Sequence, residues 1–129
     1  MPSIFTRIIR GEIPCHKLRE DERFIAFLDI RPINPGHALV VPKLEVDYLF
    51  DLPDDLLREL LIFARPVAAA LKAELPCLRI GMIVAGLEVP HAHLHLVPIN
   101  GEGELSFAQA RPADQAELKR LAAAIRARL

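Results

Sequence analysis

The sequence predicts an α+β fold with about five strands in a mostly antiparallel sheet and helices placed along the chain. A histidine-containing run at residues 91–98 alternates with the period of two that is typical of a strand. Residues 56–71 and 118–125 carry apolar side chains at helical spacing instead. With 129 residues and 52% hydrophobic content, the chain can build one packed core, so we expect a single domain over residues 1–129.

The first third of the chain predicts a short helix followed by three strands. Ser3 can cap the helix, and Gly11 suits the left-handed conformation that ends one. Apolar and β-branched residues then recur in three short segments separated by charged or proline-rich turns. We expect strands at residues 16–19, 23–28 and 37–42.

The rest of the chain predicts two longer helices with two strands between them. The first helix begins near Pro53 and continues past Pro66, because its apolar stripe stays in phase on both sides of that proline. A strand follows at residues 78–84, before the histidine run. The last helix begins near Asp114, with Glu117 at capping-box spacing.

The histidine run is the strongest functional signal, because a strand over residues 91–98 places three imidazoles on one face and apolar side chains in the core. Three of the five histidines of the chain lie in this run. Such a row is hard to explain by packing, since protonated rings would repel one another. It indicates a metal site or a nucleophilic site built on neutral imidazole. The core-facing residues are Ala92, Leu94 and Leu96, and the histidines are His91, His93 and His95.

Charge and cysteine usage exclude several classes of partner. The net charge is −1 and no basic block is present, which argues against nucleic acid. Cys15 and Cys77 form no CxxC pair and fit reduced thiols in a cytoplasmic protein. No apolar run is long enough to span a bilayer and no signal-peptide segment is visible, so we expect no membrane partner.

The pattern His91-Ala-His93-Leu-His95-Leu-Val97 resembles the histidine triad (HIT) family of nucleotide-binding proteins. The similarity extends over nearly the whole chain, which makes a chance match to the motif alone a poor explanation. The resemblance implies an antiparallel sheet with two main helices and assembly into a homodimer. The other matching segments, in the order and spacing of the family, are Ile4-Phe5, Gly11–Pro14, Phe27–Ile30, Pro35–His37 and Leu39–Lys43.

The resemblance implies roles for four histidines. His93 matches the nucleophile that attacks an α-phosphate and forms a transient nucleotidyl-histidine. His95 matches the residue that contacts the phosphate and assists the leaving group. His91 matches the position whose carbonyl holds the other ring nitrogen of the nucleophile, and His37 lines the same site. These roles suit unprotonated rings, since an imidazole with a pKa of about 6.5 is mostly neutral at cell pH.

The resemblance also implies a nucleoside site and an activity. Asp29 matches the acid that binds the ribose hydroxyls, beside an apolar slot for the base. The expected activity is that of a nucleotide hydrolase or nucleotidyl transferase acting on a nucleoside phosphoramidate or a dinucleoside polyphosphate. The substrate is then a purine nucleotide or a related small molecule, and no cofactor is expected. The slot residues are Ile4, Phe5, Ile8, Ile13, Phe27 and Ile30, although the same residues would also suit a plain core.

One departure from the family concerns zinc. Many members bind a structural zinc through two cysteines, a histidine after the Pro-Lys pair and the first triad histidine. Here Ser3, Thr6 and Glu45 occupy the first three positions. Three of the four ligands are therefore lost, and we expect no metal at this site.

A second departure concerns phosphate recognition. The family commonly has Gln followed by Ser or Thr in the turn before the triad, where this chain has Leu87 and Glu88. Ile83 lies nearest to the position of a usual upstream Asn. These changes motivate an alternative, a nucleotide-binding or sensing module with vestigial chemistry. A third alternative is a metalloenzyme that uses the histidine row itself, although the predicted strand offers no acidic ligand.

Overall fold

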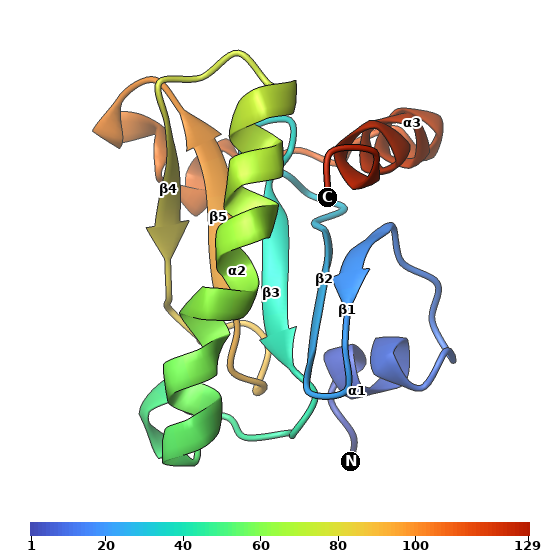
Figure 1. The fold of residues 1–129 in the computed structure, drawn as a ribbon, viewed down its shortest axis with the longest axis vertical. Helices are drawn as coiled ribbons and strands as arrows, with labels where there is room; N and C mark the ends of the chain where they lie inside the picture. Colours follow the sequence, from blue (N-terminus) through green and yellow to red (C-terminus); the bar gives the residue numbers. More distant parts are fainter.

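One five-stranded antiparallel sheet organises the protein, and its strands lie in the order β1-β2-β3-β5-β4 (Figure 1). The structure is a computed structural model that describes residues 1–129. It confirms the predicted α+β fold with an antiparallel sheet. The strands are β1 Lys17–Glu20, β2 Phe24–Leu28, β3 Ala38–Pro42, β4 Arg79–Ile83 and β5 Leu94–Ile99; the α-helices are α1 Ile4–Ile9, α2 Asp54–Glu74 and α3 Gln115–Arg126.

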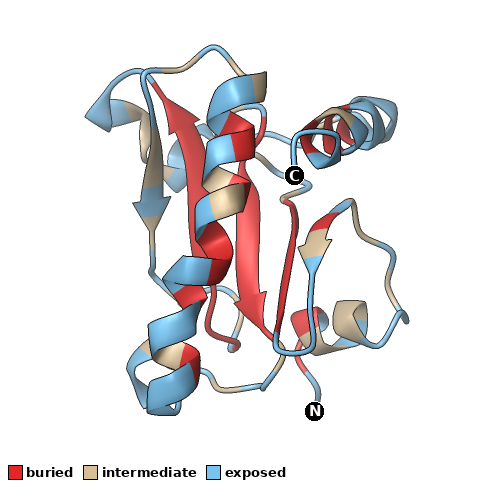
Figure 2. Ribbon diagram, in the orientation of Figure 1, coloured by how far each residue is buried: buried red, intermediate tan, exposed pale blue.

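Helices α2 and α3 cover one face of the sheet and enclose the main core. The apolar stripe of α2 packs against β2, β3, β4 and β5, and that of α3 packs against β1 and β2. Strands β2, β3 and β5 are buried along their length (Figure 2). Helix α2 continues through Pro66 as predicted. Asp114 caps α3 by accepting a hydrogen bond from the Glu117 backbone N–H, which confirms the predicted start of that helix. Ala92, Leu94 and Leu96 belong to this core, as the alternation predicted.

The opposite face of the sheet carries a smaller apolar cluster and the histidines. Phe5 of α1 packs there with Ile25 and Phe27 of β2 and with Leu39 and Val41 of β3. Helix α1 begins after Ser3, whose side chain accepts a hydrogen bond from the Thr6 N–H. The short α1 therefore forms a wall beside one half of this face and leaves the other half to the loops after β3 and β4.

The strand predicted over residues 91–98 begins later, at Leu94, and this prediction was wrong in its first three residues. Pairing with β3 ends at Val40 and Leu94. Before that point the Ala92 N–H donates to the Val46 carbonyl, so a loop replaces the neighbouring strand as hydrogen-bond partner. His91 and His93 thus lie in an irregular segment, and only His95 lies in β5. The apolar alternation is kept nonetheless.

No helix of the structure combines the length and the hydrophobicity that crossing a bilayer requires.

Candidate active site

Four buried histidines lie together on the sheet face opposite α2. His91, His93 and His95 come from the segment that leads into β5, and His37 comes directly before β3. All four are buried, with at most 7% of any residue exposed. The rings of His93 and His95 stack edge to face with centroids 4.7 Å apart. The fold therefore concentrates four imidazoles in one place, and each finds a hydrogen-bond partner there.

Backbone carbonyls assign the tautomers of His91 and His93. The Nδ1 atom of His93 lies 2.6 Å from the His91 carbonyl oxygen. A carbonyl can only accept, so this nitrogen carries the proton and the Nε2 atom of neutral His93 keeps a free lone pair. The Nε2 atom of His91 lies 2.7 Å from the Pro42 carbonyl and donates to it. His91 therefore holds His93 through its backbone while its own ring is fixed by β3.

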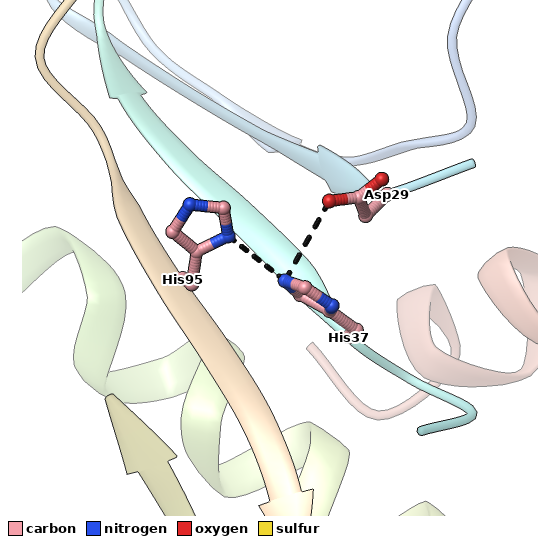
Figure 3. A group of neighbouring side chains, drawn as sticks. All are labelled: Asp29, His37 and His95. Carbon is pink, nitrogen blue, oxygen red and sulfur yellow. Dashed lines mark hydrogen bonds and ion pairs between the residues drawn. The ribbon is translucent and has the colours of Figure 1, made fainter. Parts of the chain in front are cut away.

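A backbone N–H assigns the tautomers of His37 and His95 in turn. The Ile33 N–H donates to Nδ1 of His37 at 2.9 Å, so the proton of neutral His37 is on Nε2. That nitrogen lies 2.9 Å from Nδ1 of His95 and donates to it (Figure 3). The proton of neutral His95 is then on Nε2. The site thus combines a ring with a free lone pair, His93, and a ring with a free N–H, His95.

Burial keeps three of these rings neutral at neutral pH. Loss of solvation is the main cause and the charge of His93 adds to it, so the pKa of His37 falls to about 4. The same two causes, together with His37, lower the pKa of His95 to about 3. Burial also lowers the pKa of His93, against the opposing effect of its hydrogen bond to His91. A neutral His93 is the form that can act as a nucleophile.

Asp29 lies at the end of β2 beside the histidines and at the edge of an apolar slot. Its Oδ1 atom accepts from the Arg31 N–H at 2.9 Å, and burial raises the pKa of its carboxyl group. Its Oδ2 atom lies 3.6 Å from Nε2 of His37. This contact is too long for a hydrogen bond and involves a neutral ring, so it leaves Oδ2 free for a ligand.

The structure brings every predicted slot residue into one cavity with Asp29. The cavity has a volume of about 140 Å³. Phe5 and Phe27 form its buried floor, with ring centroids 5.7 Å apart, and Phe5 also stacks on the His93 ring at 4.9 Å. Phe5 therefore connects the slot to the imidazole with the free lone pair. The predicted residues that line it are Ile4, Phe5, Ile8, Ile13, Phe27, Asp29 and Ile30.

Asp29, His37 and His95 also form a group whose donor atoms lie within 4.8 Å of one another, as metal ligands do (Figure 3). The acidic residue that the predicted histidine strand lacked is thus supplied by Asp29, directly after β2. The hydrogen bond from Ile33 nevertheless occupies Nδ1 of His37 and puts its proton on Nε2, the atom that would face an ion. The protonation state of His37 therefore does not fit metal binding, and the group is better described as a hydrogen-bonded relay.

Ser3, Thr6 and Glu45 do meet around His91, where they form a hydrogen-bonded network. Ser3 Oγ lies 2.7 Å from Nδ1 of His91 and donates to it, since Nε2 carries the ring proton. Glu45 accepts from the Ser3 N–H at 2.8 Å and from the Thr6 hydroxyl at 2.5 Å. The donor set of two hydroxyls and a carboxylate, already satisfied internally, does not fit structural zinc. Ser3 was predicted as a helix cap and all three residues as positions of lost zinc ligands, whereas their contacts with His91 and with one another were not predicted.

The turn between β4 and β5 closes the site on the side away from the slot. Residues 85–88, His93, His95 and Phe107 bound a second cavity of about 110 Å³, which we call the leaving-group cavity. Phe107 stacks on His95 with centroids 4.8 Å apart and was not predicted from the sequence. Ile83 pairs with His95 across β4 and β5, so no side-chain donor stands there. No motif marks Phe107, which lies in the irregular chain that follows β5.

Comparison with known proteins gives consistent results. The HIT domain family matches residues 10–102. The adenosine 5′-monophosphoramidase of Saccharomyces cerevisiae is 41% identical over 100 residues, which cover 77% of this chain and 63% of the yeast protein.

Solved structures agree with this result. A HIT-like protein involved in cell-cycle regulation from Bartonella henselae superposes with a TM-score of 0.87 at 31% identity, over 98% of this chain and 96% of that one. A zinc-bound histidine triad family protein from Mycobacterium smegmatis has a TM-score of 0.82 at 30% identity, over 97% and 91% of the two chains.

Proposed function

This chain belongs to the HIT family, and we propose that it hydrolyses nucleotide derivatives at an α-phosphate through a covalent nucleotidyl-histidine on His93. Relatives that bear the name adenosine 5′-monophosphoramidase support hydrolase activity on nucleotide derivatives at the coarse level. In this reaction His93 is the nucleophile, the α-phosphorus is the atom that it attacks, and a purine nucleoside is the part of the substrate that the protein binds. Phosphoramidates and dinucleoside polyphosphates are the two candidate substrate types.

One observation carries the proposal: the tautomer of His93. Its Nδ1 proton is held by the His91 carbonyl at 2.6 Å, and its Nε2 lone pair is free beside a slot that ends in Asp29. A neutral imidazole fixed in this way is an activated nucleophile that needs no separate base. The slot would hold the base by stacking and Asp29 would accept from the ribose hydroxyls, which places the α-phosphate over the imidazole.

The proposed reaction has two steps. The Nε2 atom of His93 attacks phosphorus and the bond to the leaving group breaks; that group takes a proton from solvent, while the Nε2–H of His95 donates a hydrogen bond to it. Water then attacks phosphorus, the bond to His93 breaks, and the proton that the water loses returns to solvent. The products are a nucleoside monophosphate and the protonated leaving group. The relay from Ile33 through His37 supports this role, because it directs the proton of His95 to Nε2.

The test is to incubate the protein with adenosine 5′-phosphoramidate or diadenosine polyphosphate and measure AMP, followed by rapid acid-free mass spectrometry for an adenylylated protein. We expect AMP from the wild type and an adduct that maps to His93. His93→Ala should abolish turnover, with loss of the nucleophile, while AMP binding measured by calorimetry stays largely intact. AMP formation by the alanine variant, or a loss of binding equal to the loss of rate, would contradict the assignment.

A second candidate function, nucleotide binding or sensing with vestigial chemistry, is favoured by one observation. The turn before the triad supplies Leu87 and Glu88 in place of hydrogen-bond donors, and Ile83 stands opposite His95. A bound phosphate would then find few preorganised donors besides His95. Tight AMP binding without turnover of either substrate type would support this candidate, and ready turnover by the wild type would exclude it.

We also propose that the chain forms a homodimer through the β4 edge of the sheet. Strand β4 ends the sheet, and Met82 on it and Val84 directly after it are exposed. Leu61 and Ile62 of α2 are exposed as well. Uncovered edge strands with apolar side chains are normally protected by pairing. Sedimentation of the wild type as a dimer and of Met82→Lys as a monomer is the expected result, and a monomeric wild type would exclude the proposal.

A further inference from the structure

The charged side chains that line the cavities around His93 are all acidic. Three cavities adjoin the site: the slot, the leaving-group cavity, and a larger cavity between residues 47–50 and 84–87 that also reaches His93. The charged residues that line them are Asp29, Asp47 and Glu88, and none of the lining residues is lysine or arginine. A protein that bound a polyphosphate leaving group would place cations or helix N-termini there.

Glu88 is the acidic residue that lines the leaving-group cavity. It lines the leaving-group cavity together with His93 and His95, and its charge acts to raise the pKa of His93 against the larger effect of burial. It forms no ion pair, whereas Asp29 accepts from the Arg31 N–H. Its carboxylate is therefore free to interact with whatever enters the cavity.

The cavity lies where the leaving group of the proposed reaction must go. The slot with Phe5 and Asp29 takes the nucleoside on one side of His93. The remaining substituents of the phosphorus must then occupy the open space on the other side, beside His95, whose Nε2–H is directed by His37. An aliphatic stem attached to that group would extend along the apolar turn, between Glu88 and the larger cavity that contains Asp47.

We propose that the substrate is a nucleoside 5′-phosphoramidate whose leaving amine carries a second, positively charged group, and that Glu88 is the residue that recognises this charge. The inference rests on the proposed hydrolase function and narrows it. The P–N bond breaks as the bond from His93 to phosphorus forms, the leaving nitrogen takes a proton, and water later releases the nucleoside monophosphate. Diamines and basic amino-acid side chains have the required chemistry, whereas polyphosphates have the opposite charge.

The test compares two adenosine phosphoramidates of equal length, one with an aminopentyl group on nitrogen and one with a hexyl group. Glu88 is exposed, and an exposed ion pair favours binding by up to about fivefold, so we expect kcat/KM to be up to about fivefold higher for the aminopentyl substrate. Glu88→Gln should bring the ratio close to one, and added salt should reduce the wild-type ratio. Glu88→Lys should favour the hexyl substrate and raise the turnover of diadenosine polyphosphate.

Glu22→Gln is the matched control, because it removes the same charge from an exposed position in the β1–β2 turn. It should keep the wild-type ratio. This inference would be overturned if the ratio of the two kcat/KM values were near one in the wild type, or equal in the wild type and Glu88→Gln. His93-dependent release of AMP from the hexyl substrate would still support the proposed function in that case. Absence of AMP from every substrate would overturn the proposed function itself, and this inference with it.

Discussion

The two sides of His93 are built in opposite ways. On the nucleoside side, Phe5 and Phe27 are buried and Asp29 is tied to the chain by a hydrogen bond from Arg31. On the leaving-group side, 93% of Leu87 is exposed and residues 84–88 make no backbone hydrogen bond. The first side is held by helix α1 and two strands, whereas the second is a turn outside the helices and strands.

This difference indicates where substrate specificity can change without loss of the fold. A substitution in the slot disturbs the apolar cluster under α1, because Phe5 and Phe27 pack with Ile25, Leu39 and Val41. A substitution in the turn disturbs no core residue and alters only the group that faces the phosphorus. The residues on the nucleoside side are thus constrained by the stability of the fold, whereas those on the leaving-group side can change with the substrate.

The largest effect is expected on the turn side, from the double substitution Leu87→Gln with Glu88→Ser. Neither wild-type side chain donates a hydrogen bond to phosphate, and a missing donor at a developing charge costs on the order of a hundredfold in rate. We therefore expect slow wild-type turnover of unsubstituted adenosine phosphoramidate and a gain of about that size in the variant. The gain should appear in kcat and not only in KM, because the donors act where charge builds up.

The control for this gain is Leu87→Met with Glu88→Ala, which removes the carboxylate without adding a donor. It should recover little of the rate on the unsubstituted substrate. If the double donor variant is no faster than the wild type, the turn is adapted to another leaving group and is not simply a weakened phosphate site. The turn would then serve only to recognise the leaving group, and the two sides of His93 would still differ as described.

The sequence predicted the nucleoside side more fully than the turn side, for a physical reason. The slot residues lie in short segments with regular patterns, so α1, β2 and Asp29 could be placed from alternation and family spacing together. The contact of Ser3 with His91 joins positions 88 residues apart, and Phe107 reaches His95 from the irregular chain after β5. No local pattern encodes such contacts. The strand predicted to begin at residue 91 also starts later than expected, because the Ala92 N–H donates to Val46 in a loop and not to a neighbouring strand.

A smaller effect is expected on the nucleoside side, from Asp29→Ala. The carboxylate offers Oδ2 to the ribose hydroxyls, and a hydrogen bond to a charged group contributes about 1.5 kcal/mol, or roughly tenfold in affinity. Calorimetry should show about tenfold weaker binding of AMP and little change for its 2′,3′-dideoxy analogue. Asp29→Asn, which keeps one acceptor, should be intermediate. Equal weakening of both nucleotides would remove Asp29 from the ribose site and leave it as a turn residue.

The smallest effect is expected behind His93, where Ser3→Ala removes the hydroxyl that donates to His91. That hydrogen bond fixes the His91 ring, and the His91 carbonyl in turn holds the Nδ1 proton of His93. Losing one such bond costs about 1 kcal/mol, so we expect kcat to fall by about fivefold with little change in KM. The same substitution removes the cap of α1 and lowers the free energy of unfolding by about 1 kcal/mol.

Two measurements separate positioning from stability in this variant. Ser106→Ala is the matched control, because Ser106 caps a short helix at Phe107–Gln109 through the Ala108 N–H and contacts no histidine directly. Nitrogen NMR of labelled histidine reports the tautomer of His93, which should become mixed in Ser3→Ala and stay as in the wild type in Ser106→Ala. Ser3→Thr, which keeps the hydroxyl, should restore both the tautomer and kcat. If Ser3→Ala turns over more slowly but keeps the wild-type tautomer of His93, the rate is lost because helix α1 loses its cap. The hydrogen-bonded network around His91 would then support the slot and not the nucleophile.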